Sequence, residues 1–157
     1  MKKYLYPLLF PLVMFALILS FAKTVSAEML LPIVSVYDGD TIKTYIPLPT
    51  PLNKMSIRLL GIDTPENPAA SYAVTGKLGR ASCVKEAELA LEAKAVVKTM
   101  ADGAPYMTVD DYKWGKYGGR IVGKVYIEGI DVAAKLIQMG LAVEYNGGKK
   151  TKDWCIQ

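Results

Sequence analysis

Five short β-rich runs and two helical segments follow one another in this chain, and their order limits the folds that it can adopt. The β-rich runs predict strands at residues 31–37, 41–46, 55–62, 106–109 and 121–127. The helical spacing of apolar residues predicts helices at 85–100 and 132–139. Three strands, a helix, two strands and a second helix are typical of a curled five-stranded β-barrel with about two packed helices, an α+β arrangement.

Local signals mark where several of these elements begin and end. Asp38-Gly39, between the first two β-rich runs, predicts a tight hairpin. Asp131 is suited to cap the second helix, and Gly140 is suited to end it. Residues 67–82 carry scattered Gly, Pro and Ser, and we expect them to form a loop.

The first 27 residues predict a secretory signal peptide. Lys2 and Lys3 form a charged start, residues 4–22 are almost wholly apolar, and Val25-Ser26-Ala27 offers the small residues of a cleavage site. The alternative is an uncleaved membrane anchor, because the 19 residues from 4 to 22 approach the roughly 20 that cross a bilayer. Both interpretations place the domain of residues 28–157 outside the cytoplasm, as a periplasmic, secreted or membrane-anchored protein.

Beyond that segment the chain carries almost no net charge. The whole chain has 19 basic and 15 acidic residues, and the loss of Lys2, Lys3 and Lys23 leaves 16 basic residues and a formal charge of +1. This balance argues against a generally cationic coat for nucleic acid, so anion binding must rest on the local placement of charges. The chain has no histidine, which excludes every mechanism that requires a histidine base, ligand or nucleophile.

The chain has two cysteines, Cys83 and Cys155. In an oxidising compartment such a pair is typical of a disulfide, which would tie the tail to the start of the first helix. The alternative is two free thiols.

Three segments concentrate residues that suit phosphodiester hydrolysis. They are Tyr37-Asp38-Gly39-Asp40-Thr41, Arg58-Leu59-Leu60-Gly61-Ile62-Asp63-Thr64-Pro65-Glu66 and Lys116-Tyr117-Gly118-Gly119-Arg120. An arginine meets a phosphate with two hydrogen bonds, carboxylates hold a hard cation, and a nearby carboxylate positions or deprotonates a water. Each segment alone is more often a turn, a cap or a surface strand, so it is their joint order and spacing that favours hydrolysis.

The use of arginine supports this interpretation. Three of the 19 basic residues are arginines, Arg58, Arg80 and Arg120. Two of them, Arg58 and Arg120, lie inside the three segments. Because the other basic residues are lysines, we interpret these arginines as selected for the planar guanidinium group, which matches the geometry of a phosphate.

In this order, the three segments resemble the signature of the staphylococcal nuclease family. The similarity runs from about Ile33 to Tyr145 and includes Gly140-Leu141-Ala142 after the second helix. The resemblance implies an OB-fold and a calcium-dependent endonuclease that hydrolyses DNA, RNA or both.

The resemblance also assigns a metal site. Asp40 and Asp63 would supply carboxylate ligands to Ca²⁺, and Thr64 would add its backbone carbonyl. Glu66 would position, and in one version deprotonate, the attacking water.

The same resemblance assigns the groups that meet the substrate. Arg58 and Arg120 would bind the phosphate and stabilise the charge of the transition state. Tyr117, with Lys116 beside it, would lie next to the nucleotide, where its ring can pack against a sugar or base.

The chain departs from the staphylococcal enzyme at three places. Gly118-Gly119 adds a glycine before Arg120, and the proline-rich loop after Ile46 is longer. We expect the last long helix of the family to be missing from this chain. The tail has Gly147-Gly148-Lys149-Lys150 and Trp154-Cys155 in its place. This pattern resembles the exported bacterial branch, in which a disulfide from the tail could replace the docking of that helix.

Two other interpretations stay open. A non-catalytic OB-fold module would bind single-stranded nucleic acid, would be insensitive to a chelator and would cleave nothing. An envelope protein with Asp40 and Asp63 as a calcium staple would gain melting temperature with calcium and would bind no nucleic acid. The sequence implies no protein partner, and a monomer is the default expectation.

Overall fold

The computed structural model describes residues 28–51 and 53–156. The predicted signal segment, residues 1–27, lies outside the described residues, so its cleavage and the domain boundary after it stay predictions. No helix in the described part of the chain is long and apolar enough to cross a membrane.

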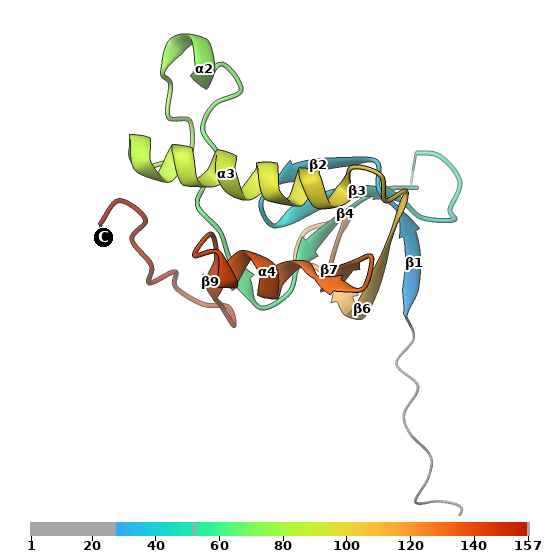
Figure 1. Ribbon diagram of the computed structural model, residues 1–157. Coiled ribbons are helices and arrows are strands. Elements are labelled where there is room, and N and C mark those ends of the chain that lie inside the picture. The colour runs from blue at the N-terminus through green and yellow to red at the C-terminus, as the bar shows by residue number, and fades with distance from the viewer. Residues whose placement is uncertain (1–27, 52, 157) are drawn as a thin grey trace, which may run out of the picture.

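The described residues form nine strands and three helices (Figure 1). The strands are β1 (Met29–Pro32), β2 (Ser35–Asp38), β3 (Thr41–Tyr45), β4 (Lys54–Leu59), β5 (Ile62–Asp63), β6 (Tyr106–Trp114), β7 (Arg120–Ile127), β8 (Ile130–Asp131) and β9 (Val143–Glu144). The helices are α2 (Tyr72–Thr75), α3 (Val84–Ala101) and α4 (Val132–Gln138).

The main sheet curls into a barrel-like shape. Its strand order is β1-β6-β7-β4-β3-β2, with β8 beside β7. Neighbouring strands are antiparallel except β4 and β7, which are parallel. β1 and β2 stand at opposite ends of this order but follow each other in the chain. Between them, Ile33 N donates to Pro105 O beside β6 and Val34 N donates to Lys43 O on β3, both at 3.0 Å. The barrel-like α+β fold is therefore confirmed, although the ladder is not closed.

The predicted single strand at 31–37 is wrong, because the chain breaks it into β1 and β2. The break has a physical reason, since the chain changes its hydrogen-bonding partner from β6 to β3 at Ile33 and Val34. The run at 55–62 is likewise divided, with Gly61 at a φ of 83° between β4 and β5. Only β4 pairs within the main sheet, whereas β5 pairs β9.

The strand predicted at 106–109 continues to Trp114 as β6. A bulge between Asp110 and Lys113 lets the strand keep pairing with β7, and Asp111 takes a φ of 47° there. The charged residues of this stretch hid its strand character from the sequence pattern. β7 matches its predicted bounds to within one residue.

The turn between β2 and β3 lies one residue later than the predicted Asp38-Gly39 hairpin. β2 includes Asp38 and β3 begins at Thr41, so that Gly39 and Asp40 form the connection. Gly39 is required because of close packing. An added Cβ would lie 2.8 Å from the Cβ of Ala93 on α3, which is too close for two carbon atoms. The connection that carries Asp40 thus rests directly on this helix.

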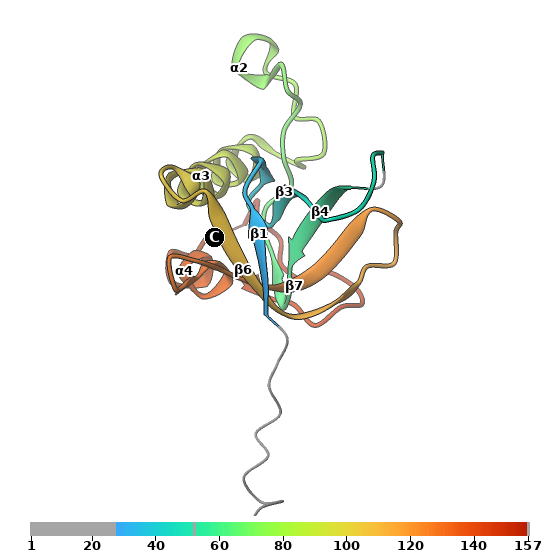
Figure 2. The same ribbon diagram turned by 90° about the vertical axis from the view of Figure 1, so that its right-hand side faces the viewer.

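Both predicted helices are confirmed to within about one residue, as α3 and α4. Asp131 caps α4 by accepting a hydrogen bond from Ala134 N at 3.0 Å, and Gly140 follows with a φ of 72°. The loop expected at 67–82 contains a third, short helix, α2, which was not predicted. This helix has no buried residue and projects away from the body of the molecule in both ribbon views (Figures 1 and 2).

The core lies between the curled sheet and the helices α3 and α4, which lie on the same side of it (Figure 2). Met55, Ile57 and Leu59 all point into it, as their alternation along β4 predicts, while Arg58 points to the other face. The side chains from the other elements include Ile42, Met107, Val109, Val125, Ala93, Val97, Val132 and Leu136.

The Cys83–Cys155 disulfide is confirmed, with the two Cα atoms 6.0 Å apart. It joins two residues 72 positions apart and returns the tail to the first turn of α3. Trp154 beside it is buried, with 6% of its surface exposed. Residues 145–156 contain no helix, so the bond and this indole secure the tail in place of a helix.

Candidate active site

The three segments meet at a small pocket of about 70 Å³. Its lining residues are Tyr37, Asp38, Asp40, Thr41, Arg58, Thr64, Pro65, Glu66, Arg80 and Arg120. All three residues predicted to be catalytic lie in this lining, as do two of the three predicted to bind metal. Asp63, the third, lies next to Thr64 and reaches the same group of charges through Arg58.

Sheet pairing brings these segments together. Thr41 at the start of β3 pairs with Arg58 on β4. β4 in turn runs parallel to β7, where Ser56 pairs with Arg120. The backbone of Asp40 accepts a hydrogen bond from Leu59 N at 2.8 Å, which holds the β2–β3 connection against β4.

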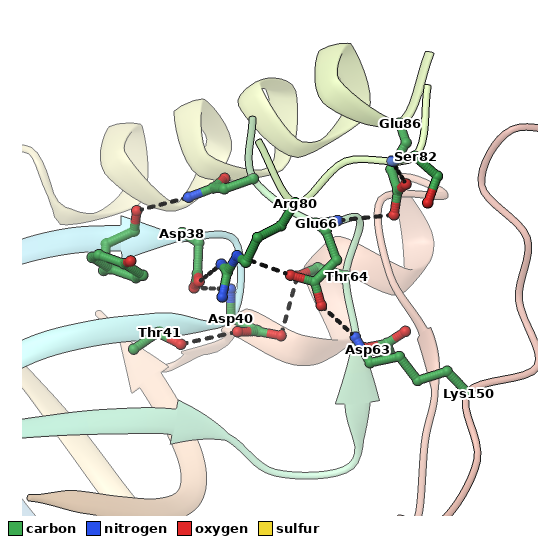
Figure 3. Close-up of polar contacts among 12 residues, drawn as sticks. Asp38, Asp40, Thr41, Asp63, Thr64, Glu66, Arg80, Ser82, Glu86 and Lys150 are labelled. Atoms are coloured by element: carbon green, nitrogen blue, oxygen red, sulfur yellow. Dashed lines mark hydrogen bonds and ion pairs between the residues drawn. The ribbon is translucent and has the colours of Figure 1, made fainter. Parts of the chain in front are cut away.

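Asp40 is the most heavily contacted carboxylate of the pocket. Arg58 donates from Nη1 to Oδ1 at 2.8 Å and places Nη2 2.7 Å from Oδ2. Thr41 Oγ1 donates to Oδ1 at 3.0 Å and Thr64 Oγ1 donates to Oδ2 at 3.1 Å (Figure 3). Burial raises the pKa of Asp40 to about 6, although Arg58 opposes this change and Asp38 adds to it.

Asp63 faces two cations. Its side chain is 4% exposed, and Oδ1 lies 2.7 Å from Lys150 Nζ and 3.8 Å from Arg58 Nη2. Both contacts are ion pairs, and this buried oxygen accepts no well-directed hydrogen bond from the described residues. Because Arg58 Nη2 contacts both Asp40 and Asp63, a single positive centre can interact with the two carboxylates.

Glu66 is partly exposed and is held from both ends. Its backbone N donates to Glu86 Oε1 at 3.1 Å, which links the loop after β5 to the start of α3. Its carboxylate accepts a hydrogen bond from Lys150 Nζ at 2.8 Å and lies 3.3 Å from Arg80 Nε (Figure 3). Partial burial raises the pKa of Glu66, but Lys150, Arg80 and Arg58 outweigh it, so the pKa lies below its ordinary value.

Sequence reasoning missed three residues of this site. Arg80 bridges Glu66 and Asp38, the latter at 3.7 Å, and Lys150 contacts Asp63 and Glu66. Glu86 is buried and also accepts a hydrogen bond from Ser82 N at 2.6 Å. Glu86 lies three residues after Cys83, the N-cap of α3, which is the spacing of a capping box, so the sequence held a signal for its position at the start of the helix. No local sequence pattern marks Lys150.

The comparison with protein families gives one result. The family model described as staphylococcal nuclease homologue matches residues 56–155, well over half of the chain. The chain belongs to this family. Its members are generally nucleases, which are hydrolases that act on nucleic acid. A search of curated proteins found no match.

The staphylococcal nuclease match covers Arg58, Asp63, Glu66 and Arg120. Asp40 lies before the matched range, and its contacts with Arg58 and Thr64 join it to residues inside that range.

Lys116 and Tyr117 are not among the residues that line the pocket. They lie in the loop between β6 and β7, with Tyr117 65% exposed and Lys116 Nζ 6.0 Å from its ring centroid. Arg120 lies three residues further along the chain and does line the pocket. A role of Lys116 and Tyr117 in substrate binding stays a prediction.

The oxygen atoms of this candidate site suit a hard cation. Asp40 and Asp63 offer carboxylates, and oxygen is the ligand type that calcium prefers. Within residues 28–51 and 53–156 no group of three or more His, Cys, Asp or Glu side chains has the arrangement of a metal site. Arg58 and Lys150 stand among the carboxylates instead. The buried Asp63 Oδ1 lies 2.7 Å from Lys150 Nζ and 3.8 Å from Arg58 Nη2, so its surroundings already suit a positive charge.

A groove of about 690 Å³ adjoins this pocket and shares Tyr37 and Arg80 with it. The complete lining is Ser35, Val36, Tyr37, Lys43, Asn67, Pro68, Ala69, Ala70, Tyr72, Ala73, Gly79, Arg80, Leu91 and Lys94. Three of these side chains are cationic and two are tyrosines, and no Asp or Glu lines the groove among the described residues. The groove therefore favours an anionic ligand with flat groups.

Proposed function

We propose that this protein is a calcium-dependent nuclease that hydrolyses phosphodiester bonds of DNA or RNA. The observation that carries the proposal is that Arg58, Arg120 and Glu66 line one pocket, against the buried carboxylate of Asp40. This pocket presents the guanidinium groups of Arg58 and Arg120 for a phosphate and the partly exposed carboxylate of Glu66 for a water.

In this proposal Asp40, Asp63 and the backbone carbonyl of Thr64 hold the metal. Calcium, when bound, would neutralise charge on the phosphate oxygens. The chain's own residues do the remaining work. Arg58 and Arg120 bind the phosphate oxygens with paired hydrogen bonds, which strengthen as charge develops in the transition state.

Glu66 is suited to orient the attacking water by accepting a hydrogen bond from it. Its lowered pKa makes it a weak base in the metal-free state, so its positioning role carries more weight there than proton abstraction. The hydrogen bond from its backbone N to the buried Glu86 fixes the backbone position of Glu66, from which the carboxylate extends. Glu86 is a positioning residue in this scheme.

The cationic groove offers a path for a single strand that leaves the pocket. Lys43, Lys94 and Arg80 can meet successive phosphates, and Tyr37 and Tyr72 can stack on bases of any sequence. A chain with a formal charge near +1 after its first 27 residues would concentrate its attraction for nucleic acid here.

We propose that the protein acts outside the cytoplasm, in the periplasm or after secretion, as a monomer. The disulfide supports this location, because such bonds persist in oxidising compartments. The apolar segment before residue 28 supports export.

The test uses the disulfide-bonded protein purified after export from a bacterial host. Single-stranded DNA is incubated with it in calcium and in excess EGTA, beside Glu66→Gln and Arg120→Ala. Lys135→Ala, an exposed change of the same charge on α4, is the matched control for Arg120→Ala.

Cleavage that requires calcium, collapses in both site variants and survives in the control is the expected result. Intact DNA in every lane, from protein with a cooperative melting transition, would overturn the nuclease. Retardation of DNA on a gel that EGTA does not change would then indicate a binding module. A calcium-dependent rise in melting temperature without DNA binding would indicate a calcium-stapled envelope protein.

A further inference from the structure

The tail of the chain is anchored on both sides of Lys150. Before it, Tyr145 N donates to Gly61 O at 2.8 Å, and the Tyr145 hydroxyl donates to Gly148 O at 2.6 Å. After it, Trp154 is buried and Cys155 is bonded to Cys83. The segment between these anchors is short, so it holds Lys150 near the pocket.

Lys150 reaches between two carboxylates of the site. Its Nζ lies 2.7 Å from Asp63 Oδ1 and donates a hydrogen bond to Glu66 Oε1 at 2.8 Å (Figure 3). The side chain of Asp63 is 4% exposed, whereas that of Lys150 is 41% exposed. The ammonium group therefore enters from the solvent side and neutralises a carboxylate that is buried.

We infer that Lys150 is a built-in counter-cation of the metal site, which holds Asp63 and Glu66 in the metal-free protein and which calcium must displace in order to bind. The inference rests on the proposed function in one respect, the assignment of Asp63 as a metal ligand. It adds a residue from the tail that sets the affinity of the site for its metal.

Displacement follows from the geometry of Asp63 Oδ1. Calcium binds carboxylate oxygen at about 2.3–2.6 Å, a distance similar to that of the ammonium group from this atom. Two cations on one oxygen would lie within a few ångströms of each other and would repel strongly in a buried site. Lys150 can leave without breaking the fold, because its side chain is already partly exposed and flexible.

The disulfide strengthens the competition. Because Cys155 is tied to Cys83 at the start of α3, the ammonium group competes as an intramolecular ligand with a high effective concentration. A tail released from Cys83 would compete less well, and the apparent affinity for calcium would rise.

The test measures calcium binding by calorimetry, without nucleic acid, on the disulfide-bonded protein. Lys150→Met removes the charge and keeps an unbranched side chain one atom shorter, and Lys149→Met is the matched control at an exposed neighbouring position. Lys150→Met should lower the calcium dissociation constant about tenfold or more, whereas Lys149→Met should leave it near the wild-type value. Lys150→Arg, which retains a charge, should stay closer to wild type.

A second readout separates displacement from simple repulsion. The amine of Lys150 should react slowly with an acylating reagent in EGTA and faster in calcium, as followed by mass spectrometry of the tail peptide. The Cys83→Ser/Cys155→Ser variant should also bind calcium more tightly, and the hydroxyl that replaces the Cys83 sulfur retains an acceptor for the cap of α3. If that variant does not fold, Lys150→Met decides.

Calcium affinity that is unchanged or weaker in Lys150→Met would overturn the inference, as would the absence of calcium binding in both proteins. The nuclease assay on the same variants separates this inference from the proposed function. Tighter calcium binding without cleavage in any protein would leave the inference standing and overturn the nuclease. Calcium-dependent cleavage with unchanged calcium affinity in Lys150→Met would do the reverse.

Discussion

Arg58 holds both carboxylate oxygens of Asp40, with Nη1 2.8 Å from Oδ1 and Nη2 2.7 Å from Oδ2. The same guanidinium group lies 3.8 Å from Asp63 and is about a quarter exposed, so it stands between the proposed metal ligands and the open side of the pocket. An arginine in this position can link metal binding to phosphate binding. It binds the carboxylate of Asp40, a proposed metal ligand, with the same guanidinium group that we propose binds the phosphate. A lysine lacks the planar fork that meets the two oxygens of one carboxylate side by side.

Replacing Arg58 should therefore impair catalysis more than substrate binding. We expect Arg58→Ala to lower kcat by a factor on the order of 10²–10³, and Arg58→Lys to restore little of it, because the paired geometry is lost. The measurement is kcat and KM on a single-stranded oligonucleotide in saturating calcium. A near-normal kcat in Arg58→Lys would show that charge alone suffices.

The raised pKa of Asp40 predicts how the stability of the metal-free protein varies with pH. The pKa rises from 3.8 to about 6 on folding, so between these values the folded state holds a proton that the unfolded chain has released. The free energy of unfolding should then fall as the pH rises through this window, by up to about 3 kcal/mol from this group. Urea unfolding in EGTA, compared with Asp40→Asn, measures it. Parallel pH profiles for the two proteins would contradict the prediction.

The Cys83–Cys155 bond should stabilise the fold appreciably. It closes a loop spanning 72 residues, and the loop-entropy argument gives about 4 kcal/mol for a loop of that length. Cys83→Ser/Cys155→Ser should lose this amount in urea unfolding, and reduced wild-type protein should behave in the same way. A double variant with the midpoint of the oxidised protein would indicate that Trp154 packing alone secures the tail.

Gly39 and Ala93 should show a packing coupling. A Cβ on residue 39 would lie 2.8 Å from the Ala93 Cβ and 3.3 Å from Thr64 Cγ2, so Gly39→Ala should cost about 1–3 kcal/mol and disturb the pocket. Ala93→Gly alone should cost about 1 kcal/mol, because it lies inside α3. The double variant should be more stable than the sum of the two losses predicts. Strict additivity in thermal unfolding would mean that the contact is relieved elsewhere.

The cationic groove predicts a dependence on substrate length and on salt. Lys43→Ala/Lys94→Ala should weaken binding of long single strands and leave cleavage of a dinucleotide nearly unchanged. If each lysine neutralises one phosphate, the slope of log affinity against log salt should decrease by roughly 1.4. Lys98→Ala, exposed on α3 and outside the groove lining, is the control. Equal losses on long and short substrates would place these lysines in the pocket itself.

Much of this protein follows from local patterns in its sequence. Helical spacing placed α3 and α4 to within about a residue, and alternation along β4 separated Arg58 from the buried face. The three segments with carboxylates and arginines supply every residue that lines the pocket except Arg80. Such features are readable because periodicity, capping and turn chemistry depend on residues only a few positions apart.

Only the tertiary structure decided which distant residues complete the site. Glu66 meets Lys150 across 84 positions, and Gly39 is required by a neighbour on α3 and not by its own backbone. The break of the first strand at Ile33 likewise reflects a change of partner within the folded sheet. The sequence by itself determined the elements and the chemical groups that they carry. Their meeting is a property of the folded chain, because charge pairing and close packing depend on distance in space, which local sequence patterns do not encode.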